Sequence, residues 1–129
     1  MDEKVKYWID LSESDLAAAK LLVSNNFLLQ AVFYCQQALE KSLKAVIARD
    51  LPDGELPPKI HNLLKLAEEA SLTDKMSNKQ EALLELVNPL SIDARYPGYD
   101  DGNPPPTKEI CERVVIEIEE FICWIKKQL

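Results

Sequence analysis

Apolar residues recur at the three- and four-residue spacing of an α-helix through almost the whole chain, and this periodicity most constrains the fold. No alternation of apolar and polar residues typical of a strand persists, and glycine occurs only three times in 129 residues. Prolines interrupt the helical pattern in two clusters, at 52–58 and at 97–106. Because proline removes a backbone donor and clashes with the preceding turn, these clusters separate helices. The sequence predicts an all-α protein.

Five helices are predicted, and three of their boundaries carry capping signals. Ser77 begins the fourth helix, with Gln80 three residues later in the capping-box position. Thr107 follows three prolines and is the predicted N-cap of the last helix. Pro89 should kink or end the fourth helix. The helices are expected to begin near residues 3, 28, 61, 77 and 107, and the first two to end near 24 and 50. With no internal repeat, we expect one domain over 1–129, an antiparallel helical bundle of four to five helices.

The last helix has a wider apolar face than one stripe requires. Its main apolar stripe consists of Ile110, Val114, Ile118, Phe121 and Ile125. The side chains that widen this stripe are Cys111, Val115, Ile122 and Trp124. A face of this width contacts neighbours on two sides. It therefore predicts either a central position in the bundle or a dimer interface.

Charge and composition exclude several classes of function. The net charge of −7 repels phosphate backbones, which argues against broad non-specific binding of nucleic acid but leaves a local basic pocket open. The three cysteines, Cys35, Cys111 and Cys123, are odd in number and lack a CxxC spacing, so we expect reduced, buried thiols. The single histidine, His61, has no cysteine near it, and neither a metal site nor a cofactor is predicted.

A stretch without charged residues, 21–39, is long enough to raise the question of a membrane span. It contains six Ser, Asn and Gln residues and is better interpreted as two helix ends around a turn at Asn25 and Asn26. The first residues are charged and lack the apolar region of a signal peptide. We expect no membrane association and a cytoplasmic location.

The polar face of the second helix is the first candidate site. At about 100° per residue, one stripe opposite the core contains an aromatic ring, two amides and two ammonium groups. Its members are Gln30, Tyr34, Gln37, Lys41 and Lys44. Such a stripe is either a solvated surface or a site where hydrogen bonds and stacking hold an anionic or nucleobase-bearing ligand. The sequence leaves both interpretations open.

Two further candidates lie outside helices. His61 follows two prolines at a junction between a loop and a helix, where its ring could bond a neighbouring carbonyl or serve a site. The segment "SIDARYPGYDDGNPPP" (91–106) places Arg95 and Tyr96 before the last helix. Arg95 could grip a phosphate while Tyr96 stacks on a base. Alternatively, Arg95 pairs with Glu40 or caps a helix, and Tyr96 packs beneath the loop.

Three blocks in this order resemble the HEPN domain family (higher eukaryotes and prokaryotes nucleotide-binding domain). They are "FYCQQALEKSLKAVIA" (33–48), "PPKIHNLLKL" (57–66) and "DARYPGYD" (93–100), and the similarity covers nearly the whole chain. The combination of "QQALEKSLKA", a Pro-His junction and a late "RYP" is more specific than any block alone.

The resemblance implies a bundle of four or five helices, like nucleotidyltransferase substrate-binding subunits, that commonly forms a homodimer. It also implies binding of a nucleotide or RNA, and a small nucleotidyltransferase as partner in a toxin-antitoxin-like two-component system. Some members of the family are metal-independent ribonucleases whose signature is an Arg followed, after four to six residues, by a His.

This chain departs from the ribonuclease signature, because no histidine follows Arg95. Without one there is no general base in the expected place to activate a 2′-hydroxyl, and no catalytic residue is predicted. The leading hypothesis is a non-catalytic module whose ligand contacts are Tyr34, Gln37, Lys41, Lys44, His61, Arg95 and Tyr96. The alternatives are an RNA endonuclease that uses Arg95 with His61, and a protein-interaction module in which the stripe is inert.

Overall fold

The structure, a computed structural model, describes residues 2–95 and 106–129, of which 89–95 are described by their backbone alone. It contains α-helices and one short 3₁₀ helix, and no strand occurs within these ranges, so the predicted all-α class is confirmed. The elements are α1 (Glu3–Ser24), α2 (Leu28–Arg49), α3 (Leu63–Glu69), η1 (Thr73–Lys75), α4 (Asn78–Arg95) and α5 (Lys108–Lys126).

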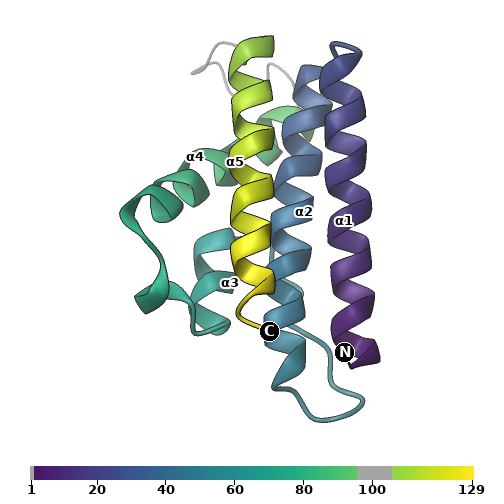
Figure 1. The fold of residues 1–129 in the computed structure, drawn as a ribbon, viewed down its shortest axis with the longest axis vertical. Coiled ribbons are helices and arrows are strands. Elements are labelled where there is room, and N and C mark those ends of the chain that lie inside the picture. The colour runs from purple at the N-terminus through teal and green to yellow at the C-terminus, as the bar shows by residue number, and fades with distance from the viewer. Residues whose placement is uncertain (1, 96–105) are drawn as a thin grey trace.

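Three long helices form the body of the bundle, and two further helices cover one side of it (Figure 1). α1 and α2 make an antiparallel hairpin, and α5 runs antiparallel to α1, as the ion pairs Lys20–Glu119 and Glu13–Lys126 show. α5 is parallel to α2, because Arg49 at the end of α2 donates to the carbonyl of Gln128. The shorter α3 and the first half of α4 lie to the side of α2 and α5 (Figure 1).

The predicted capping residues end and begin the helices as expected. After α1, Asn26 adopts a φ of +65° and the amide of Phe27 donates to the carbonyl of Leu22, a pattern that closes a helix C-terminus. Ser77 and Gln80 exchange side-chain bonds with each other's amides at 3.1 and 2.9 Å, which is the capping box. The hydroxyl of Thr107 accepts from the amide of Ile110.

Of the two expectations for Pro89, a kink or the end of the fourth helix, the second is wrong, because α4 continues through this residue to Arg95. A proline within a helix removes one hydrogen bond, here to the carbonyl four residues earlier. That residue, Glu85, lies on the exposed side of α4, where water has access to the helix. The proline therefore does not need to terminate the helix.

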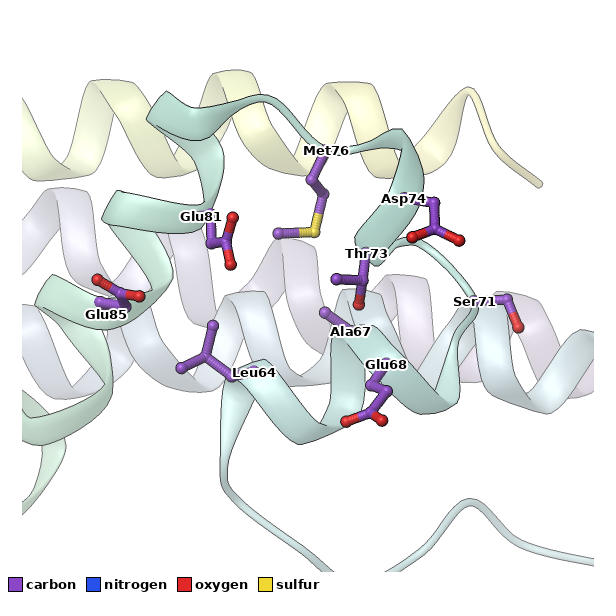
Figure 2. A pocket seen from close by; sticks show the side chains of 9 residues that line it. All are labelled: Leu64, Ala67, Glu68, Ser71, Thr73, Asp74, Met76, Glu81 and Glu85. Carbon is purple, nitrogen blue, oxygen red and sulfur yellow. The ribbon is translucent and has the colours of Figure 1, made fainter.

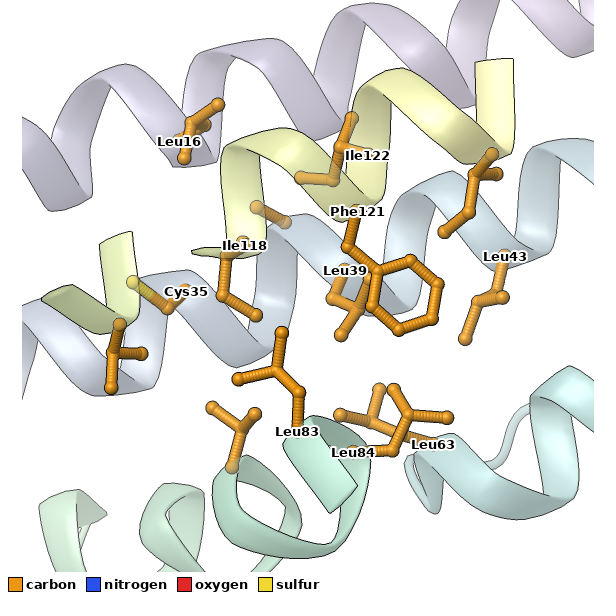
Figure 3. Packing of buried hydrophobic residues seen from close by; sticks show 14 of the residues in the cluster. Leu16, Cys35, Leu39, Leu43, Leu63, Leu83, Leu84, Ile118, Phe121 and Ile122 are labelled. Carbon is orange, nitrogen blue, oxygen red and sulfur yellow. The ribbon is translucent and has the colours of Figure 1, made fainter. Parts of the chain in front are cut away.

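α2 lies at the centre of the core and packs against α1, α3, α4 and α5. Figure 3 shows Leu39 of α2 beside Phe121 and Ile118 of α5, with Leu83 and Leu84 of α4 on the other side. Burying a large apolar side chain contributes roughly 1.5–3 kcal/mol, so this layer supplies much of the stability.

α5 buries its wide apolar face inside the bundle. Cys111, Val115 and Ile122 are all buried, and α5 contacts α1, α2 and α4. The sequence left two interpretations of this face open, a central position in the bundle and a dimer interface. Contacts within one chain are enough to explain the width of the face.

Three side chains of apolar or thiol character lie outside the core. Ile110, in the first turn of α5, is 40% exposed, and Leu86 of α4 is 50% exposed while its neighbour Leu84 is buried. Cys123 is exposed, so the expectation of three buried thiols is wrong for one of them. In each case the period of 3.6 residues places the side chain at the edge of the buried stripe, where the crossing angle of the neighbouring helix decides its burial.

Among the described helices, none combines the length and the hydropathy that spanning a bilayer would require.

Candidate functional site

The ring of His61 is held against α2 by a buried carboxylate. Its Nδ1 lies 2.8 Å from Oε1 of Glu40, and because a carboxylate only accepts, the ring N–H donates. The Glu40 side chain is 3% exposed, whereas the His61 side chain is 63% exposed. The main-chain carbonyl of His61 also accepts a bond from Nε2 of the buried Gln36. Two contacts to α2 thus hold this residue in place while most of its ring remains exposed to solvent.

The second oxygen of Glu40 is bonded to Lys44, one turn further along α2. The Nζ–Oε2 distance is 3.3 Å, and the ammonium group also lies 5.7 Å from the ring centroid of Trp8 on α1. The Lys44 side chain is 8% exposed, so it lies beneath the surface stripe in which the sequence pattern placed it. The reason is that α1 crosses α2 here and covers the lysine with Trp8. Lys44 therefore compensates the charge of Glu40 and stabilises its position.

A second chain of polar contacts runs along α2 beside the first. Gln37 donates to Oε1 of Gln36 at 2.7 Å and accepts from Lys41 at 3.1 Å. Lys41 also makes an ion pair of 2.7 Å with Asp15 on α1, and both side chains are less than one-fifth exposed. These contacts join Lys41 and Gln37, through Gln36, to the loop that carries His61.

The remaining residues of the stripe are less closely connected. Tyr34 is half-buried, packs against the core and makes an edge-to-face contact with Phe33, with ring centroids 5.5 Å apart. Gln30 is exposed at the start of α2.

The expectation that Arg95 lies outside a helix is wrong, because it is the last residue of α4, and the structure describes its backbone alone. Tyr96 lies outside the described residues. The start of α3 is linked to α4 through Asn88, whose Oδ1 accepts from the amide of Leu63 at 3.0 Å.

Sequence reasoning missed the roles of Glu40 and Gln36. Each was assigned to no site, yet both are buried polar side chains that hold the His61 junction. A signal was present in the spacing of Glu40 and Lys44, which are four residues apart and therefore adjacent on a helix. The partner of His61 comes from 21 residues earlier in the chain and was not visible locally.

Buried thiols and metal-binding groups do not add to this site. Desolvation raises the pKa of Cys35 to about 12, with a further contribution from the neighbouring Cys111, whose own pKa is raised by burial. A thiol in this state is neither a nucleophile nor a metal ligand. Among the described residues, no group of three His, Cys, Asp or Glu side chains could hold a metal ion.

Comparison with known proteins identifies solved structures with a similar fold and a matching family. No curated protein matches the sequence. Among solved structures, TT1696 from Thermus thermophilus is similar, with a TM-score of 0.80 and 19% identity over 99% of this chain and 100% of that one. ST0689, described as an archaeal HEPN homologue, is also similar, with a TM-score of 0.65 and 22% identity over 99% of this chain and 98% of that one. The model of the family described as HEPN domain matches residues 5–128. With nearly its whole length matched, the chain belongs to the HEPN domain family.

Proposed function

We propose that this protein is a non-catalytic HEPN module that binds a nucleotide or an RNA element on the face formed by His61, Gln37, Lys41 and Tyr34, hereafter the His61 face. The observation that carries the proposal is the exposed His61 ring fixed by the buried carboxylate of Glu40. An aromatic ring whose orientation is set in advance loses little entropy when a base stacks on it, and such stacking contributes about 1–3 kcal/mol per base.

The neighbouring side chains suit the rest of such a ligand. The amide of Gln37 can bond a base edge, and the ammonium group of Lys41, which is bonded to Asp15 and Gln37, has one further N–H to donate to a ligand oxygen. Arg95 and Tyr96 are proposed to complete the contacts to phosphate and base. Lys44 is buried, so its proposed role is to hold Glu40 and, through it, His61.

Two features favour binding over cleavage. Lys41 on this face and Lys44 beneath it are each bonded to a carboxylate, so neither supplies an unpaired positive charge to stabilise a pentacovalent phosphorus. The family resemblance also associates cleavage with a histidine that follows the arginine, and none follows Arg95.

A second candidate function is a metal-independent RNA endonuclease. It is favoured by one observation, the bond between His61 and Glu40, because a carboxylate that orients an imidazole is the usual support of a general base. This candidate requires that single-stranded RNA is cut in the presence of EDTA and that cutting disappears in His61→Ala.

The same resemblance supports a small nucleotidyltransferase as partner, in a toxin-antitoxin-like pair, and a homodimer as the assembly. Light scattering of the isolated protein, and of the protein mixed with a small nucleotidyltransferase, tests both assemblies.

The binding proposal is tested by fluorescence anisotropy with a labelled single-stranded RNA about ten nucleotides long, within the range that one binding module covers. We expect His61→Ala to weaken binding by about tenfold through loss of one stacked base, and Arg95→Ala to weaken it through loss of a phosphate contact. Lys79→Ala removes an exposed cation elsewhere on the surface and should change the Kd by less than about twofold. Equal affinity in wild type and His61→Ala would refute the site. Intact RNA after incubation would separate binding from the endonuclease candidate.

A further inference from the structure

A hollow with a small apolar floor and an acidic rim lies between α3, η1 and α4. Its volume is about 590 Å³. Figure 2 shows Met76 projecting from the segment after η1 towards Leu64 and Ala67, which form the floor. Carboxylates surround this floor from three elements, and they are Glu68, Asp74, Glu81 and Glu85. We call this feature the acidic groove.

The carboxylates of the acidic groove lack cationic partners within the described part of the chain. All four residues are exposed, and no ion pair to any of them is found there. The opposite side of the bundle differs, since Glu119, Glu13 and Asp10 are each paired with a lysine. Glu81 and Glu85 are also one helical turn apart, a spacing at which like charges destabilise a helix. Negative potential therefore concentrates over a concave apolar floor.

The shape and the charge together select the kind of occupant. The described residues offer no arrangement of three ligating groups for a metal ion, so a bare divalent cation is not favoured. RNA and nucleotides would be repelled by four carboxylates. The floor requires an apolar group, and methionine at its centre can adapt to side chains of different shapes. A volume of this size is within the range of about 300–1,000 Å³ that binding pockets occupy.

We propose that the acidic groove is a docking surface for a lysine- or arginine-rich segment of a partner protein. The segment inserts one aliphatic side chain between Met76, Leu64 and Ala67, and its flanking cations pair with Glu81 and Glu85 on one side and Glu68 and Asp74 on the other. This inference is independent of the proposed nucleotide site, because the two sites share no residue.

The test uses the intact protein and the peptide Lys-Lys-Leu-Lys-Lys, with methionine labelled by ¹³C at its methyl group. The chain has two methionines, so the signal of Met76 is easily assigned. We expect the peptide to shift this signal, and the double variant Glu81→Gln/Glu85→Gln to weaken binding by about fivefold to tenfold, the loss of two exposed ion pairs. The matched control Glu55→Gln/Glu109→Gln removes the same charge elsewhere and should bind within about twofold of wild type.

Three results would overturn the proposal. Equal weakening in both double variants would mean diffuse attraction to an acidic protein. Equal binding of Lys-Lys-Ala-Lys-Lys would mean that no apolar side chain enters the groove. Displacement of the peptide by spermine at the peptide's own concentration would mean a site for small polycations. Unchanged thermal unfolding of each variant shows that a lost signal does not come from misfolding.

Discussion

At the scale of single residues, the buried Glu40 is the side chain on which the candidate site depends. It is 3% exposed and bonds both His61 and Lys44. A buried carboxylate with two partners is stabilised, but removing it leaves the buried ammonium of Lys44 without a counter-charge. Glu40 therefore links the stability of the protein to the geometry of its proposed site.

We expect Glu40→Ala to lower the free energy of unfolding by about 3 kcal/mol, because breaking a buried ion pair leaves one uncompensated charge. Asp15→Asn breaks the more exposed pair with Lys41 and should cost no more than about 1 kcal/mol. Urea unfolding of both variants checks the difference. Equal losses of unfolding free energy in the two variants would contradict this role of Glu40, because they would mean that Lys44 finds another counter-charge.

The buried thiol of Cys35 makes the free energy of unfolding depend on pH in the alkaline range. Burial raises its pKa from 9.0 to about 12, so the folded state keeps the proton that the unfolded state releases. The stabilisation is fully present below pH 9 and is lost as the pH rises towards 12, by about 1.4 kcal/mol per pH unit for one group. Cys35→Ala should therefore show a shallower loss of stability than wild type between about pH 9 and 10.5. Parallel curves for the two proteins would show that Cys35 ionises equally in both states.

At the scale of elements, the ends of the helices are better determined by the sequence than their crossing angles. The predicted capping box and N-cap are present, because a cap depends on residues three apart. The expectation that Pro89 could end the fourth helix is wrong, since helix continuation depends on the surroundings of the proline. The burial of Leu84 but not of Leu86 depends on the neighbouring helix. Likewise, the bond of His61 to Glu40 depends on how the loop after α2 returns to it.

The end of α3 carries a strained residue. Ser71 has a φ of +58° and follows the helix in the position where glycine is usual, with the amide of Leu72 bonded to the carbonyl of Ala67. We expect Ser71→Gly to raise the free energy of unfolding by about 0.5–1 kcal/mol, because glycine has no Cβ penalty in this region. Asn26→Gly is the comparison, and its gain should be smaller because asparagine tolerates the conformation. A loss of stability in Ser71→Gly would mean that the hydroxyl contributes more than the backbone strain costs.

At the scale of the whole molecule, the fold brings two surfaces of different chemistry to different parts of one bundle. The His61 face lies on α2 and the loop before α3, and the acidic groove lies between α3, η1 and α4. With a net charge of −7, the protein cannot attract RNA through its overall field. Any nucleotide binding must therefore come from local contacts, and its dependence on salt should be shallow.

The sequence predicted the fold class and the family, and it missed the contacts that arise from packing. Helical periodicity was sufficient to predict the fold class. The three sequence blocks 33–48, 57–66 and 93–100 were sufficient to predict the family. The burial of Lys44 under Trp8 and the pairing of Lys41 with Asp15 could not be predicted, because both partners come from α1. Contacts between helices are set by crossing geometry, which a single helical stripe does not encode.

The most direct test of the proposed nucleotide site is a two-dimensional NMR titration of wild type and His61→Ala with ATP, GTP and a short single-stranded RNA. We predict shifts at Tyr34, Gln37, Lys41 and His61 that are absent in the variant, with the signals of the acidic groove unchanged. The absence of shifts at millimolar ligand, or shifts that persist in His61→Ala, would contradict a nucleotide site on the His61 face.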